Sequence, residues 1–234
     1  MPGLLENVQL FFHTVLLALG ALLPIVDPLA GAPIFREMTQ AADPRERAVT
    51  ARAVAVDSFL LLLASTFVGA YVLDFFGLSI PIVQVAGGVV VCAMGWTLLN
   101  RPDEAPEAAR ATVAEAAPAK SRNLRRRAFY PLTMPLTVGP GSISVAITLG
   151  ANPSPDVRSL LVTAAGHIVG MFAVAVSVYL CYRYADAIVR RLGETGSIVA
   201  ARLSAFILLC IGVQIGWNGV RGLIASAFPG VVGS

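Results

Sequence analysis

Side chains that can ionise or form several hydrogen bonds occur inside long hydrophobic runs of this sequence, where such groups are rare. An aspartate at the centre of a membrane helix costs roughly 2.5 to 3.5 kcal/mol, so these groups normally face a cavity or a polar partner. Two of them, Gln214 and Asn218, are four positions apart and would share one helix face. The candidates for binding a polar solute, a cation or a proton are Asp27, Asp57, His167, Gln214 and Asn218.

Each of these candidates also has a structural interpretation, which the sequence leaves open. Asp27 precedes Pro28, the usual order of a helix N-cap and first helical residue, so capping competes with a cation or proton role. For Asp57 a structural hydrogen bond or ion pair competes with a proton relay, and for His167 helix packing competes with carrying a proton. Arg202 stands at the start of the last hydrophobic run, where it could pair with Asp27, receive an anionic substrate or anchor the helix at the membrane surface.

Two hydrophobic segments are interrupted by proline and glycine in a similar order. Residues 24–35 read PIVDPLAGAPIF, and residues 131–143 read PLTMPLTVGPGSI. Proline inside a helix removes a backbone donor and clashes with the preceding turn, at about 3 kcal/mol or more. We therefore expect a break in each helix, and we call these stretches the first and second broken segments. Inside a bilayer such a break survives only where protein or a water-filled cavity satisfies the freed backbone groups.

The first two prolines of the two broken segments match in register, and their glycine parts lie one residue out of register. Aligning Pro24 with Pro131 brings Pro28 onto Pro135. Interrupted hydrophobic segments at corresponding places in two halves of a chain point to the binding site of a transporter. The residues that these breaks add to the candidate site are Pro28, Gly31, Pro33, Pro135, Gly139, Pro140 and Gly141.

Three stretches, DPLAGAPIF, VAGGVVV and PLTMPLTVGPGSI, resemble the MarC family of bacterial inner-membrane proteins. The resemblance covers nearly the whole chain. It implies a six-span fold, distantly similar to LysE-type exporters, and a transport role in the bacterial inner membrane. Members of that family usually show Asn-Pro at the position of Asp27 and Pro28, and Arg at the position of Gln84.

Composition indicates an integral membrane protein independently of the resemblance. Hydrophobic residues make up 56% of the 234 positions and charged residues 13%, against roughly 25% charged in an average soluble domain. Six spans of about 20 residues fit this length. We expect an all-α integral membrane protein with six transmembrane helices, the first from about residue 10 and the others at about residues 48–72, 80–99, 129–149, 160–182 and 203–223.

The expected spans divide into two halves of three helices. Residues 1–100 form the first repeat, residues 101–127 a polar linker and residues 128–234 the second repeat, within one membrane domain. All but two of the 17 Lys and Arg residues fall in the loops after spans one, three and five, the exceptions being Arg158 and Arg221. The positive-inside rule then places the linker in the cytoplasm and both termini outside. Because each half has three spans, the second repeat is inverted relative to the first.

Several functions find no support in the sequence. The basic residues are spread over short loops without an aromatic platform, which argues against nucleic-acid binding. Cys92, Cys181 and Cys210 lack metal or redox spacing, so no metal or cofactor is expected. The phosphate-binding motif GxxxxGK[ST] is absent, which argues against direct ATP drive by this chain. The absence of HExxH and GxSxG argues against a membrane-embedded enzyme.

The leading hypothesis is a secondary transporter or exporter of a small polar or charged solute, with its site between the two broken segments and with a coupling proton or cation. A channel or a structural membrane protein is the alternative, and a membrane-embedded enzyme is the third. The lipid bilayer is the expected partner. Small residues four positions apart, at residues 166 and 170 and at residues 212 and 216, could also join copies into a homo-oligomer.

Overall fold

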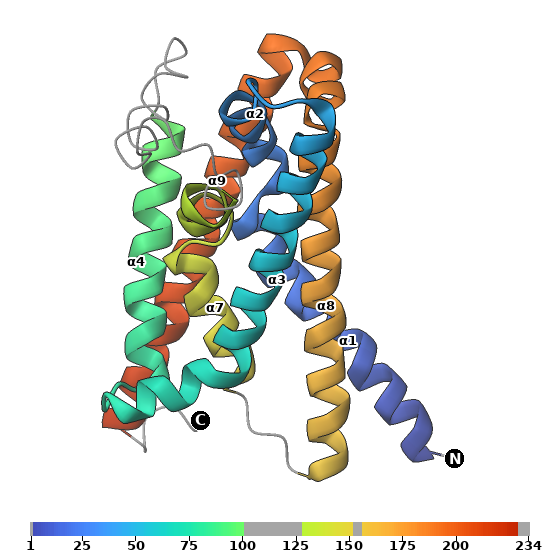
Figure 1. Ribbon diagram of the computed structural model, residues 1–234. Coiled ribbons are helices and arrows are strands. Elements are labelled where there is room, and N and C mark those ends of the chain that lie inside the picture. Colours follow the sequence, from blue (N-terminus) through green and yellow to red (C-terminus); the bar gives the residue numbers. More distant parts are fainter. Residues whose placement is uncertain (1, 101–127, 152–155, 229–234) are drawn as a thin grey trace.

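The computed structural model describes residues 2–100, 128–151 and 156–228, and its regular elements are helices (Figure 1). The first half contains α1 (Pro2–Val26), α2 (Pro28–Met38), α3 (Pro44–Phe75) and α4 (Ile80–Leu99). The second half contains η1 (Ala128–Thr137), α7 (Pro140–Gly150), α8 (Val157–Arg183) and α9 (Ala185–Ala227). The linker expected at residues 101–127 lies outside the described residues.

Among the described residues, five helical stretches are long and apolar enough to cross a membrane. Large hydrophobic side chains are exposed on their outer faces, including Leu16, Tyr71 and Phe172. Exposed hydrophobic side chains in this number suit contact with lipid and not with water. The all-α membrane fold predicted from composition is therefore confirmed, with the stretches Leu5–Val26, Pro44–Phe75, Ile80–Thr97, Val157–Arg183 and Arg202–Ala227.

The stretch expected as the fourth span, residues 129–149, is two short helical segments. η1 ends at Thr137 and α7 begins at Pro140, and Tyr130 and Met134 inside η1 have extended backbone angles. α7 has 11 residues and is about 16 Å long, roughly half the 30 Å hydrocarbon core. The break predicted in this segment is confirmed, and neither piece crosses a membrane by itself.

The first broken segment contains one break, at Asp27 between α1 and α2. Asp27 is the one non-glycine residue of the described chain with a positive φ, at 38° with ψ 65°. Aspartate tolerates this left-handed conformation better than most residues because its short side chain bonds to the local backbone. Pro28 follows at the start of α2, where its missing N–H has no consequence. Pro24 and Pro33 lie inside helices, so only the middle proline marks the break.

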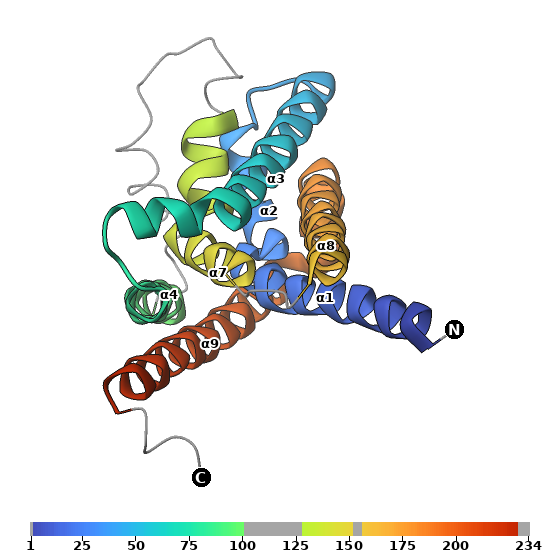
Figure 2. The same ribbon diagram turned by 90° about the horizontal axis from the view of Figure 1, so that it is seen from below.

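The helices form a bundle, and their direction alternates along the chain in the order α1, α3, α4, α7, α8 and α9. α4 packs along α9, α1 along α8, and α3 along both α7 and α8. In Figure 1, α1, α4 and α8 run upward, whereas α3, α7 and α9 run downward. The start of α1 and the end of α9 therefore lie at the same end of the bundle, and Figure 2 shows them leading away from its centre in different directions. The α2–α3 and α8–α9 turns lie at the opposite end.

Glycines bring the backbones of α4 and α9 into contact. A Cβ atom added to Gly88 would lie 2.5 Å from the backbone nitrogen of Gly216 and 2.7 Å from the carbonyl oxygen of Gly212. One added to Gly95 would lie 2.8 Å from the backbone nitrogen of Leu209. Between helices in lipid the hydrophobic effect contributes little, so close packing of small residues is what holds such a pair together.

The small-residue faces proposed for a homo-oligomer are used within the chain. A Cβ atom added to Gly166 would lie 2.8 Å from the Thr14 side chain of α1, and one added to Gly170 would lie 2.7 Å from Ala18. The face at residues 212 and 216 packs on α4 in the same way. These faces are therefore not available to a second copy, which corrects the expectation from sequence.

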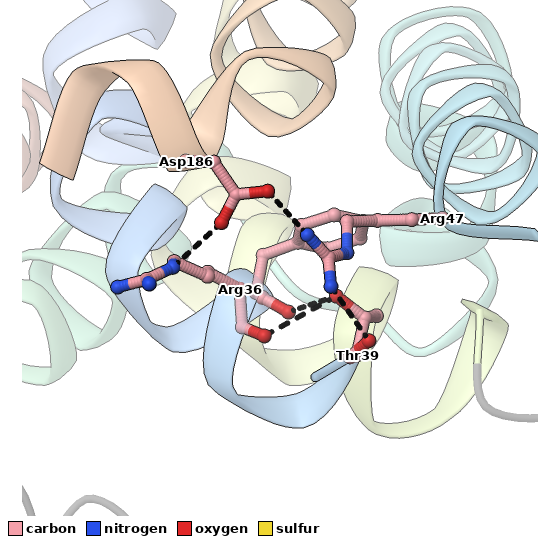
Figure 3. Close-up of polar contacts among 5 residues, drawn as sticks. Arg36, Thr39, Arg47 and Asp186 are labelled. Atoms are coloured by element: carbon pink, nitrogen blue, oxygen red, sulfur yellow. Dashed lines mark hydrogen bonds and ion pairs between the residues drawn. The ribbon is translucent and has the colours of Figure 1, made fainter. Parts of the chain in front are cut away.

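An ion-pair cluster ties three elements together at the end of the bundle that carries the α8–α9 turn (Figure 3). Asp186 of α9 accepts a hydrogen bond from Arg36 Nε of α2 at 2.6 Å and another from Arg47 Nη1 of α3. Arg47 Nη2 also donates to the carbonyl oxygen of Thr39 at 3.3 Å. Because the Arg47 side chain is only 18% exposed, solvent screens its pair with Asp186 less than the pair of Arg36 with Asp186, whose side chains are 45% and 39% exposed.

Replacing Gly88 by Ala tests the contact between α4 and α9. The added methyl group meets backbone atoms of α9 that cannot rotate away, so we expect a loss of stability of about 1 to 3 kcal/mol from overpacking. Thermal unfolding of the purified protein in detergent measures it. The matched control is Gly20→Ala in α1, where no atom lies within 4 Å of the added Cβ and helix propensity favours Ala by about 1 kcal/mol. Equal stability of the two variants would contradict the packing.

Candidate functional site

Tyr182 of α8 lies between the two broken segments and contacts both. Its side chain is completely buried. Its ring stacks on Phe35 of α2, with 4.6 Å between ring centroids and 16° between planes. Its hydroxyl group forms a 2.8 Å hydrogen bond with the hydroxyl of Thr137, the last residue of η1. One side chain therefore joins the helix after the first break to the segment before the second.

Gly31 allows α2 to lie directly on this tyrosine. A Cβ atom added at Gly31 would lie 2.5 Å from the Tyr182 hydroxyl oxygen and 3.2 Å from two ring atoms. A side chain at this position would therefore push the ring away from α2, from Thr137, or from both. The glycine of the first broken segment is required here for close approach and not for an unusual backbone angle.

Hydroxyl groups satisfy the irregular backbone of the second broken segment. The Thr133 hydroxyl donates to the carbonyl of Ala128 at 2.7 Å, and the Thr137 hydroxyl donates to the carbonyl of Leu132 at 2.7 Å. The Ser142 hydroxyl, in the first turn of α7, lies 2.9 Å from another carbonyl of the segment. Away from water, unpaired carbonyl groups would be costly, so these side chains make the break tolerable inside a bilayer.

The start of α7 packs against the first broken segment and against α4. Gly139 is the N-cap residue of α7 and supplies no side-chain cap, and Pro140 occupies the first turn. A Cβ atom added to Gly141 would collide with a methyl group of Val91 and lie 3.7 Å from Ile25, two residues before the Asp27 break. The two broken segments are thus neighbours in space as well as matched in sequence.

Asp27 completes a polar cluster at this meeting point. Its carboxylate accepts a 3.2 Å hydrogen bond from the backbone amide of Ala30, which caps α2, and Ser204 of α9 lies beside it. Gly31, which lies against the Tyr182 hydroxyl, donates its backbone N–H to the Asp27 carbonyl at 3.1 Å, so Asp27 and Tyr182 lie close together. We call the four residues gathered here, from four parts of the chain, the polar junction: Asp27, Thr137, Tyr182 and Ser204.

The other candidates from the sequence lie away from the polar junction or at its edge. His167 is buried in α8, 15 residues before Tyr182, which places it about 22 Å along the helix axis. Gln214 and Asn218 are exposed on α9 and hydrogen-bonded to each other at 3.0 Å. Their shared face, predicted from spacing, is confirmed, and it points outward.

The remaining candidates divide by burial. Pro28 and Gly139 are buried, Pro33 is half-buried, and Pro140 is exposed. Asp57 is half-buried on α3 beside Ser58, a fully buried residue whose hydroxyl has no partner among the described residues. Arg202 is exposed, two residues before Ser204, and the side chain of Pro135 lies outside the described set.

Sequence reasoning missed three members of the polar junction. Tyr182 comes at the end of a hydrophobic run and directly before Arg183, the usual place of an interfacial aromatic residue. Ser204 carries no signal. Thr137 lies inside the second broken segment, and a hydroxyl beside a helix break is a signal that could have identified it. Among the described residues, no group of three or more His, Cys, Asp or Glu side chains could hold a metal ion.

Comparisons with known proteins agree over most of the chain. The family model for "MarC family integral membrane protein" matches residues 11–224. Proteins named "inner membrane protein MarC" are similar over 218 residues, which is 91% of this chain and 96% of theirs. The identity is 33% for Salmonella arizonae, 32% for Salmonella typhimurium and 31% for Escherichia coli O139:H28. No solved structure matches.

A double-mutant cycle tests the contact between Gly31 and Tyr182. Gly31→Ala alone should lose about 1 to 3 kcal/mol, because its methyl group meets the phenol oxygen at 2.5 Å. Tyr182→Phe alone should lose about 1 kcal/mol with the hydrogen bond to Thr137. In the double variant the oxygen is gone, so the Gly31→Ala loss should shrink. Thermal unfolding of the four proteins in detergent measures the coupling, and strictly additive losses would show that the two residues do not touch.

Proposed function

Because this chain belongs to the MarC family of integral membrane proteins, we propose that it is a secondary transporter or exporter of a small polar or charged solute. It acts in the bacterial inner membrane, the location that the names of its relatives state. The observation that carries the proposal is the polar junction, where two broken helices meet inside an otherwise apolar bundle. Broken helices at such a place expose hydrogen-bonding groups to a substrate in secondary transporters.

Two inverted repeats make this junction. η1 and α7 together form one crossing, the fourth along the chain, which brings the total to six. This pair corresponds to α1 and α2, while α3 corresponds to α8 and α4 to α9. Support comes from packing, because α3 lies beside α8, α4 beside α9 and α1 beside α7. In each pair the two helices run in opposite directions (Figure 1). Elements related by a two-fold axis in the membrane plane meet at that axis in this antiparallel way.

The polar junction offers both acceptors and donors to a solute. The Asp27 carboxylate accepts hydrogen bonds, and the hydroxyls of Thr137, Tyr182 and Ser204 can donate or accept. The start of α7 adds the positive end of a helix dipole without a side-chain cap. Such a mixture suits a solute that carries both polar and charged groups. We assign the coupling proton or cation to Asp27, the acidic member of the junction.

In this proposal the conformation described above corresponds to a closed state of the transporter. Tyr182 has no exposed surface and Thr137 is 2% exposed, whereas Asp27 and Ser204 are half-buried, so a solute reaches Tyr182 and Thr137 only after α2 or η1 moves. The breaks on either side of the junction are where such motion is easiest, since few backbone hydrogen bonds cross them. A structural membrane protein would need no such motion, and a channel would conduct without coupling, so flux measurements separate the three.

The same proposal includes the orientation of the chain. Residues 101–127 face the cytoplasm and both termini face outward, because nearly all Lys and Arg residues belong to the loops on one side. In support, Arg36 and Arg47 lie together at the end of the bundle where α8 turns into α9 (Figure 3). We propose no enzymatic activity, since none of the catalytic motifs considered in the sequence is present.

Thr137→Val tests the polar junction in transport. Metabolite profiling of cells that lack or overproduce the protein identifies the solute, and its flux is then measured in proteoliposomes. Valine keeps the shape of threonine but leaves the buried Tyr182 hydroxyl without a partner, so we expect flux to fall about tenfold. The matched control is Thr97→Val on α4, where an exposed threonine bonds only to its own helix. Equal flux in both variants would remove the junction from the transport path.

Asp27→Asn tests coupling at the first break. Asparagine caps a helix as well as aspartate and tolerates a positive φ, so folding should change by a few tenths of a kcal/mol, whereas Asp27→Ala should lose about 1 kcal/mol. If the carboxylate takes up a proton during transport, the Asn variant loses the pH dependence of flux. The control is Asp43→Asn, another N-cap followed by proline, which lies exposed at the start of α3. Superimposable pH profiles for Asp27→Asn and the parent would leave Asp27 as a cap alone.

A further inference from the structure

A groove of about 430 Å³ lies on the outside of the bundle where α8 turns into α9. Its walls come from the last turn of α8, from Tyr184 at the turn, and from the first two turns of α9. Most of the lining residues are apolar, and one of them is cationic. The lining residues are Leu180, Cys181, Tyr184, Ala187, Ile188 and Arg191.

The position of the groove places it at the boundary between lipid and water. The membrane-spanning stretch of α8 ends at Arg183, whose guanidinium group lies 5.8 Å from the centre of the Tyr184 ring. Tyr184 is 56% exposed and Leu180 is 46% exposed, so an aromatic and an aliphatic side chain both face the surroundings. Exposed tyrosine beside arginine at the end of a span is typical of the headgroup level of a bilayer.

We propose that this groove binds an anionic phospholipid. The acyl chain lies against Leu180, Ala187 and Ile188, and the phosphate group of the lipid is held by Arg191. Apolar walls that open toward lipid next to an exposed cation match a molecule with an acyl chain and a negative head. A soluble anion would use Arg191 but not the apolar walls, and a zwitterionic lipid gains less from the cation.

This lipid site is separate from the polar junction and does not depend on transport. The two are adjacent, because Cys181 lines the groove and the next residue, Tyr182, faces the interior. A lipid in the groove therefore packs on the helical turn that holds the buried tyrosine. The experiment below measures lipid binding alone, so its outcome is independent of any flux measurement.

Native mass spectrometry of the purified protein tests the proposal directly. The protein in detergent is mixed with phosphatidylglycerol or phosphatidylcholine that have the same acyl chains, and the bound lipid is counted. We expect the parent to retain more phosphatidylglycerol, and Arg191→Gln to weaken its binding about fivefold, the effect of one cation at a membrane surface. Arg190→Gln removes the neighbouring exposed arginine, which does not line the groove, and should bind as the parent does.

A second variant tests the apolar walls without a change of charge. Ala187→Phe fills the groove and should lower binding of phosphatidylglycerol, while Ala64→Phe, an exposed alanine on α3, should not. Equal retention of the two lipids by the parent would overturn the proposal, as would equal losses in Arg190→Gln and Arg191→Gln. Displacement of the lipid by inorganic phosphate alone would assign Arg191 to a soluble anion and also overturn it.

Discussion

The contact of one buried tyrosine with two interrupted helices is the constraint on which the centre of this structure depends. Tyr182 stacks on Phe35 after the first break and hydrogen-bonds Thr137 before the second. A membrane interior supplies no water to irregular backbone, so every freed carbonyl there needs a partner from the protein. The threonine and serine hydroxyls of the second broken segment supply these partners, and one of them, on Thr137, also bonds Tyr182.

Two kinds of packing surround this centre. α4 and α9 meet backbone to backbone through glycines, which leaves no room for a change of side chain. The elements around Tyr182 meet through side chains and through two helix breaks instead. Dense glycine contacts resist motion, whereas breaks permit it, because few backbone hydrogen bonds cross them. The α4–α9 pair is thus the natural frame, and α2 and η1 are the natural moving parts, of the transporter that we propose.

Asp27 has more than one role in the membrane region of this chain. Asp27 caps α2, adopts the left-handed conformation at the break and also lies beside Ser204 of α9. A single carboxylate therefore supports the local backbone and lies in the polar junction at the same time. Gln214 and Asn218, by contrast, satisfy each other on the outer face of α9 and contribute nothing to the junction. All three residues are polar, and it is their position in the bundle that places Asp27 in the junction and leaves Gln214 and Asn218 outside it.

The sequence by itself determined the class of the protein and the places where its helices break. A hydrophobic share of 56% with only 13% charged residues indicates a bilayer, and the prolines in residues 24–35 and 131–143 predicted a helix break in each segment, because the missing N–H is a local property. Within the first segment only Pro28 marks the break, since Pro24 and Pro33 lie inside helices. Even the cap at Asp27 follows from a carboxylate before a proline. These features depend on neighbours in the chain, which the sequence shows directly.

Only the tertiary structure decided what meets the breaks and which helix faces are free. Nothing local distinguishes Tyr182 from an interfacial aromatic residue, and its role depends on Gly31 and Thr137, 151 and 45 residues away in the chain. The glycine faces at residues 166–170 and 212–216 could equally have met a second copy, since a small-residue face specifies close packing but not the partner. Periodicity describes the face of one helix, whereas the choice of the helix that covers it depends on how the whole chain packs.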